Sequence, residues 1–251
     1  MRRGALVCVL IAMLVPGCTS SSGGRSEEIL VFAAASLKET FDDIGSAFER
    51  AHRGIRVSFN YGASSGLATS IANGARADVF ASASPVWMDA VAETPGVAGR
   101  AVFSRNRLVV IVPKDNPAGI RRFADLAKPG IKVVLAATSV PAGRYARAAL
   151  MQAGLRSAEG NVVSNEVDVK GVVQKVLLGE SDAGIVYATD VTNPVAAQVS
   201  VVSIPDLVNI IATYPIAVVQ GSSHAEAARA FVAFVLADGQ AILRAAGFLA
   251  P

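Results

Sequence analysis

Short apolar runs alternate with amphipathic segments along most of the chain. Between most of the runs, apolar residues recur at helical spacing, as Phe41, Ile44 and Phe48 do. The runs themselves are predicted strands, and they cover residues 29–34, 56–61, 77–82, 107–113, 131–136, 183–187, 199–203 and 214–220. Alternation of strands and helices is typical of an α/β fold with mainly parallel sheets.

Two of the predicted strands, 107–113 and 214–220, stand apart because each carries a proline near one end. The segment between them has strands and helices of its own. We therefore expect a discontinuous first domain, residues 29–109 plus 216–251, with a second domain, residues 110–215, inserted into it. The chain would cross between the domains twice, and two crossings would form a hinge.

The N-terminal segment has the pattern of an export signal. Arg2 and Arg3 precede an apolar run that is too short to span a bilayer, which predicts a signal peptide over residues 1–17. The following Val-Pro-Gly-Cys resembles a lipobox, which implies cleavage before Cys18 and a lipid on that cysteine. The alternative is a plain signal peptide with an incidental cysteine. Residues 18–28, rich in Ser and Gly, are predicted to be a flexible tether.

Composition limits the classes of function. A length of 251 residues with 52% hydrophobic residues is ample for one or two cores. Because Cys8 lies in the segment to be removed, Cys18 has no partner for a disulfide. The formal charge of +3 falls to +1 without Arg2 and Arg3, which gives no electrostatic footprint for nucleic acid. The two histidines are far apart, so no metal site and no cofactor are predicted.

Ser36 and Ser64 are the first candidate binding residues, because each follows a predicted strand and opens a predicted helix. A serine there offers its hydroxyl beside unpaired backbone N–H groups and the positive end of the helix dipole. Two such helix ends facing each other would bind an anion without Lys or Arg. The structural alternative for Ser36 is a capping box with Glu39, in which the hydroxyl only caps the helix.

The second domain has two comparable turns. One leads through Pro141 into a predicted helix, and the other ends at Asp168, a natural N-cap. The backbone N–H groups of Ala142 and Val169 could point into a cleft there. Tyr187 ends a buried strand, where its hydroxyl would either complete the core or reach a ligand.

A hydrolase is the main alternative of another class. Gly62-Ala-Ser-Ser-Gly66 satisfies the G-x-S-x-G pattern of a nucleophile elbow, with Ser64 as the nucleophile. The only histidine downstream is His224, which lies within a predicted capping box, Ser223 to Glu226. A short pattern with two free positions is weak evidence for a catalytic triad.

The chain resembles the molybdate-binding proteins of ABC-type transporters over nearly all of its mature length. The resemblance rests on these blocks: Val31-Phe-Ala-Ala-Ala-Ser-Leu37, Ser64-Ser-Gly-Leu-Ala68, Ala77-Asp-Val-Phe-Ala-Ser-Ala83, Trp87-Met-Asp89, Val140-Pro-Ala-Gly143, Asp168-Val169, Gly184-Ile-Val-Tyr187, and the tail from Gly239 to Phe248. It implies a two-lobed periplasmic-binding-protein fold of type II, with the ligand in the cleft between the domains.

The resemblance also implies roles for single residues. The oxyanion would be held by hydroxyl and N–H groups of Ser36 and Ser64, by the N–H groups of Ala142 and Val169, and by the Tyr187 hydroxyl. Ser65 could share the role of Ser64. Arg144, two residues after Ala142, is expected to point away from the anion or to guard the rim.

The function implied by the resemblance is transport. The protein would be an extracytoplasmic lipoprotein, anchored through Cys18 to the outer face of the plasma membrane. It would act as a monomer and not as an enzyme, capturing molybdate or tungstate and delivering it to a membrane permease with its ATPase. Another oxyanion, such as sulfate, is the alternative ligand.

Overall fold

The computed structural model describes residues 27–251. The expected signal peptide and Cys18 lie outside the described residues. Glu27 and Glu28, expected to belong to the tether, are instead the first residues of strand β1. Within residues 27–251, none of the helices has both the length and the apolar character needed to cross a membrane.

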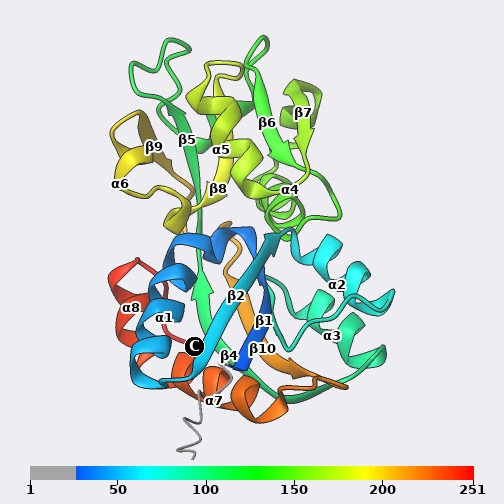
Figure 1. Cartoon of the computed structure of the whole chain (residues 1–251). Coiled ribbons are helices and arrows are strands. Elements are labelled where there is room, and N and C mark those ends of the chain that lie inside the picture. The colour runs from blue at the N-terminus through cyan, green and yellow to red at the C-terminus, as the bar shows by residue number, and fades with distance from the viewer. Residues whose placement is uncertain (1–26) are drawn as a thin grey trace, which may run out of the picture.

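The described chain forms two lobes, each built around a five-stranded sheet (Figure 1). In spatial order, the sheet of the first lobe consists of β2 (Ile55–Gly62), β1 (Glu27–Ala34), β3 (Val79–Ala81), β10 (Ala212–Val219) and β4 (Val97–Asn106). The helices of this lobe are η1 (Ala35–Leu37), α1 (Lys38–Ala51), α2 (Ser64–Ala72), α3 (Pro85–Glu93), α7 (Ala225–Leu236) and α8 (Gly239–Ala245).

The second lobe repeats this plan. In spatial order, its sheet consists of β7 (Val162–Glu166), β6 (Val133–Ala136), β8 (Ala183–Tyr187), β5 (Leu108–Pro113) and β9 (Val199–Ser203). Its helices are η2 (Phe123–Ala127), α4 (Pro141–Gln152), η3 (Arg156–Asn161), α5 (Val169–Leu177), η4 (Ala188–Asp190) and α6 (Asn193–Ala196).

One strand in each sheet runs against the others. These strands are β10 in the first lobe and β5 in the second, and both of their neighbours pair with them in antiparallel fashion. The remaining pairs are parallel. β5 and β10 are the first strands after the two crossings between the lobes, and they are the two proline-bearing runs of the sequence. The expected domain boundaries, 109/110 and 215/216, fall inside them, whereas strand pairing assigns each strand whole to one sheet.

The core of the first lobe forms where the apolar face of α1 meets the C-terminal helices. Phe41 and Phe48 are fully buried on α1, and both rings contact Phe231 of α7, with centroids 6.2 and 5.3 Å apart. Burying an aromatic side chain of this size contributes about 1.5–3 kcal/mol. This cluster fixes α1, and therefore the turn that precedes it, against the sheet.

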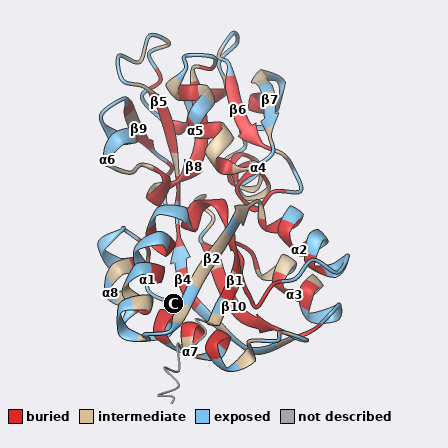
Figure 2. Ribbon diagram, viewed as in Figure 1, coloured by how far each residue is buried: buried red, intermediate tan, exposed pale blue. Residues whose placement is uncertain are grey.

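The junction of the lobes is lined by buried residues (Figure 2). The carboxyl ends of β1, β2, β6, β7 and β8 meet there, each followed by a turn into a helix. In α/β proteins, ligands bind beyond the carboxyl ends of the strands. The fold therefore places these five strand-to-helix turns where a small ligand can be enclosed.

Candidate anion-binding site

One small cavity, with a volume of about 10 Å³, lies between the lobes. All five residues expected to bind the ligand line it: Ser36, Ser64, Ala142, Val169 and Tyr187. The others that line it are Ala34, Ala35, Gly62, Ala63, Ala83, Val140, Pro141 and Asp168. A cavity of about 10–15 Å³, measured in this way, holds a single water molecule. This cavity therefore suits an ion or a very small molecule.

The two serines are held in different ways. Ser64 is the first residue of α2, and its Oγ accepts a hydrogen bond of 2.9 Å from the backbone N–H of Ala83. Because that oxygen already has a donor, the Ser64 hydroxyl proton is free to be donated into the cavity. Ser36 lies in η1, and its Oγ is 2.9 Å from the hydroxyl of Tyr214.

The alternative role of Ser36, in which its hydroxyl only caps the helix, is wrong. Helix α1 begins only at Lys38, its N-cap residue is Leu37, and no side chain caps it. Ser36 instead lies within the 3-10 turn η1, which precedes the first turn of α1. Glu39, the other half of the expected box, forms an ion pair with Lys170 instead.

The turns of the second lobe present backbone N–H groups. Ala142 is the second residue of α4 and Val169 is the first residue of α5, so neither N–H has a partner within its helix. A Cβ atom at Gly143 would lie 2.1 Å from the carbonyl oxygen of Ala136. Glycine at this position therefore allows α4 to start directly against the end of β6. The predicted N-cap at Asp168 is confirmed, since its carboxylate accepts from the N–H of Gly171 at 3.0 Å.

Tyr187 ends β8 at the edge of the cavity and is 1% exposed. Among the described residues, its hydroxyl has no hydrogen-bond partner. Burial raises the pKa of this hydroxyl well above its ordinary value, so it keeps its proton at neutral pH. A buried hydroxyl without a partner is costly, and a ligand oxygen in the cavity would satisfy it.

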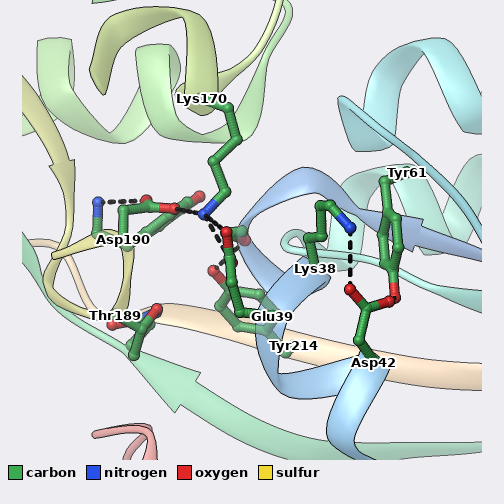
Figure 3. A network of polar contacts seen from close by, with 11 residues as sticks. Lys38, Glu39, Asp42, Tyr61, Lys170, Thr189, Asp190 and Tyr214 are labelled. Carbon is green, nitrogen blue, oxygen red and sulfur yellow. Dashed lines mark hydrogen bonds and ion pairs between the residues drawn. The ribbon is translucent and has the colours of Figure 1, made fainter. Parts of the chain in front are cut away.

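Two cations of the second lobe, each within two residues of a proposed backbone donor, point across to the first lobe. Arg144 of α4 donates to Ser84 Oγ at 2.7 Å, which agrees with the expectation that it turns away from the cavity lining. Lys170 of α5 contacts Glu39 of α1 at 2.8 Å and Asp190 of its own lobe at 3.1 Å (Figure 3). The only charged residue in the cavity lining is Asp168, and that carboxylate is engaged with the first turn of α5.

Lys170, Asp190 and Glu39 form an ion triad that sequence reasoning missed. Asp190 is buried, and its second oxygen accepts from the N–H of Tyr187 at 3.1 Å. Burial raises the pKa of Asp190, and the ammonium of Lys170 opposes that shift. Burial lowers the pKa of Lys170, but the two carboxylates of Asp190 and Glu39 raise it by more. The net effect is a raised pKa, so Lys170 stays charged. The triad thus connects Tyr187, a cavity-lining residue of the second lobe, to the first lobe.

A serine hydrolase based on Ser64 is not supported. His224 lies in a separate surface depression, 3.4 Å from Asp78, and does not line the cavity. The capping box expected at Ser223 is also wrong, because α7 starts after His224 without a side-chain cap. Ser65 is buried but does not line the cavity either. Residues 27–251 hold no group of three or more His, Cys, Asp or Glu that could bind a metal ion.

Comparisons with known proteins agree with this architecture. The family model for bacterial extracellular solute-binding proteins matches residues 29–249. The molybdate-binding protein ModA of Mycobacterium tuberculosis is 40% identical over 258 residues, which cover 99% of this chain and 97% of that protein.

Two solved structures have the same fold. The substrate-binding domain of a putative molybdenum ABC transporter from Clostridium difficile superposes with a TM-score of 0.69 at 30% identity, covering 90% of this chain and all of that one. The sulfate-binding protein SubI of M. tuberculosis superposes with a TM-score of 0.77 at 23% identity, covering 88% of this chain and 86% of that one.

Two α/β lobes with a small cavity between them are the architecture of a solute-binding protein. The chain belongs to the family of bacterial extracellular solute-binding proteins. The expected two-lobed periplasmic-binding-protein fold is confirmed.

Proposed function

We propose that this protein binds molybdate, and equally tungstate, and delivers it to the permease and ATPase of an ABC transporter. The observation that carries the proposal is the set of neutral donors from both lobes around one small cavity. The relative that matches over 99% of this chain and the solved structure at 30% identity are both described by molybdate or molybdenum. Ser36, Ser64, Ala142, Val169 and Tyr187 are the proposed ligands of the oxyanion.

The physical balance supports a dianion held without a counter-ion. Each hydrogen bond to a charged group contributes about 1.5–3 kcal/mol. Three hydroxyls and the N–H groups of three helix starts, those of α2, α4 and α5, offer enough bonds to replace much of the lost hydration. The donors come from separate lobes, so they surround the ligand only when the lobes are together. Opening the lobes would return the anion to water.

The cellular setting is part of the same proposal. The signal pattern of residues 1–17 and the lipobox-like segment before Cys18 support a monomeric lipoprotein on the outer face of the plasma membrane. Residues 18–26 would then join the lipid to the first strand. The protein would act as a binding component and not as an enzyme.

Sulfate is the alternative ligand because SubI shares the fold. At 23% identity that likeness concerns the fold alone, whereas the 40% identity to ModA extends over the whole chain. Sulfate has the same charge and shape as molybdate and is smaller, so the size of the cavity decides between the two ligands.

Calorimetry with sodium molybdate, tungstate and sulfate tests the proposal. We expect Ser36→Ala and Ser64→Ala each to weaken molybdate binding at least about tenfold, which is about 1.4 kcal/mol. Ser65→Ala is the matched control, since this buried neighbour does not line the cavity. Binding of sulfate in preference to molybdate, or full affinity in both cavity variants while they remain folded, would contradict the proposal.

A further inference from the structure

Tyr214 lies outside the cavity lining, yet its hydroxyl contacts one of the lining residues. The residue is on β10 of the first lobe, and its side chain is fully buried. Its ring is packed between Phe103, Phe248 and Tyr187, with centroid distances of 6.1, 5.6 and 5.8 Å. Its hydroxyl therefore has a fixed position, 2.9 Å from Ser36 Oγ.

The direction of this hydrogen bond decides what Ser36 can offer a ligand. A serine hydroxyl has one proton, so Ser36 cannot donate to Tyr214 and to an anion at once. If Tyr214 donates, the Ser36 oxygen is satisfied and its proton is available to the cavity. Ser64 shows the same arrangement in a form without ambiguity, because its oxygen accepts from the N–H of Ala83.

The surroundings of Tyr214 keep its proton in place. Burial is the main cause that raises the pKa of this hydroxyl, and the carboxylate of Asp190 raises it further. Tyr214 therefore keeps its proton at neutral pH and can act as a neutral donor. An anion that accepts from Ser36 would align both protons in one direction, and hydrogen bonds in such a chain strengthen one another.

We propose that Tyr214 is a positioning residue of the oxyanion site, which donates to Ser36 Oγ and so directs the Ser36 proton at the ligand. The inference rests on the proposed function. Tyr214 does not touch the ligand and acts through Ser36. The chain of donation runs from β10, through the turn after β1, into the cavity.

A double-mutant cycle tests this role with sodium molybdate and isothermal calorimetry. Tyr214→Phe keeps the packed ring and removes the hydroxyl, and we expect it to weaken binding about two- to tenfold. In the Ser36→Ala background the same substitution should cause no further loss, because the group through which Tyr214 acts is gone. Tyr61→Phe is the matched control, since it removes a first-lobe hydroxyl that donates to Asp42. It should bind like the parent.

The outcomes separate the inference from the proposed function. Parent affinity in Tyr214→Phe, or losses that multiply in the double variant, would overturn the positioning role, because both would show that Tyr214 does not act through Ser36. Thermal midpoints of the empty proteins show whether a loss comes from unfolding. If the parent binds sulfate and not molybdate, the ligand proposal fails and the same cycle, run with sulfate, still decides the role of Tyr214. A parent that binds no oxyanion of the panel overturns both.

Discussion

Gly143 and Gly66 occupy the same position in the two lobes and should respond to alanine in opposite ways. Each is the third residue of a helix that starts at the cavity, Gly143 in α4 and Gly66 in α2. A Cβ at Gly143 would lie 2.1 and 2.3 Å from the carbonyl oxygens of Ala136 and Ala137, whereas a Cβ at Gly66 would meet nothing within 4 Å.

The expected magnitude for Gly143→Ala follows from those contacts. The neighbouring atoms are backbone, so the start of α4 must move by about 1 Å to restore an ordinary contact. Overpacking of this kind costs about 1–3 kcal/mol, and we expect the upper end because no flexible side chain can give way. For a chain of this size that corresponds to a midpoint of thermal unfolding lower by about 6–12 °C.

The same shift moves the N–H of Ala142 away from its proposed ligand. Losing one hydrogen bond to a charged group weakens binding about tenfold or more. Gly66→Ala should leave the affinity unchanged and raise the free energy of unfolding by about 0.5–1 kcal/mol, since alanine is the better residue within a helix.

Thermal unfolding of the empty variants and calorimetry with molybdate measure the two effects separately. Parent stability and affinity in Gly143→Ala would show that the close approach of α4 to β6 is not needed. A comparable loss of affinity in Gly66→Ala would show that a side chain at either helix start disturbs binding. The effect at Gly143 could then not be attributed to the close approach of α4 to β6.

Three further predictions concern closure, charge and pH. Molybdate should lower the radius of gyration measured by small-angle scattering, because donors from both lobes must meet one anion; an unchanged radius in a starting state shown to be open would refute this. Arg144→Ala should weaken binding much less than Ser36→Ala in calorimetry, since its guanidinium bonds to Ser84; a larger loss would show that it reaches the ligand. Burial raises the pKa of Tyr187 and Tyr214, so above about pH 10 the unfolded chain binds fewer protons than the folded one, and the free energy of unfolding should fall by about 1.4 kcal/mol per pH unit for each of them. Urea denaturation of Tyr187→Phe at several pH values should show a free energy of unfolding that falls less steeply with pH than that of the parent, by the contribution of one tyrosine. The same pH dependence in the variant and the parent would contradict the assignment.

The binding turns were predictable from the sequence because each is a local signal. An apolar run, small residues and a helix start lie within about ten residues of one another at Ser36, Ser64, Ala142 and Val169. Parallel strands place such turns at one edge of a sheet, so the fold class brings them together. Asp168 was predicted as an N-cap on the same local grounds, and the structure confirms it.

The features that could not be predicted depend on contacts with residues far away in the sequence. β4 and β7 are edge strands in which several residues face solvent. Neither is a continuous apolar run, so neither was predicted as a strand. The capping-box patterns at Ser36 and Ser223 have the right spacing in the sequence, but neither box forms. Both helices start later than these patterns indicate. Tyr214 and Ser36 are 178 positions apart, and no local pattern joins them.

The cations near the cavity contact the opposite lobe, whereas the groups proposed to bind the ligand are neutral donors. Arg144 and Lys170 each lie within two residues of a proposed backbone donor, yet both contact the opposite lobe, at Ser84 and Glu39. A cation that touched the ligand would strengthen binding in every arrangement of the lobes and slow release. A cation that bridges the lobes contributes only when they are together, as the neutral donors do. Under the proposed function, capture and release would therefore depend on the same motion, and water would compete for the anion as soon as the lobes part.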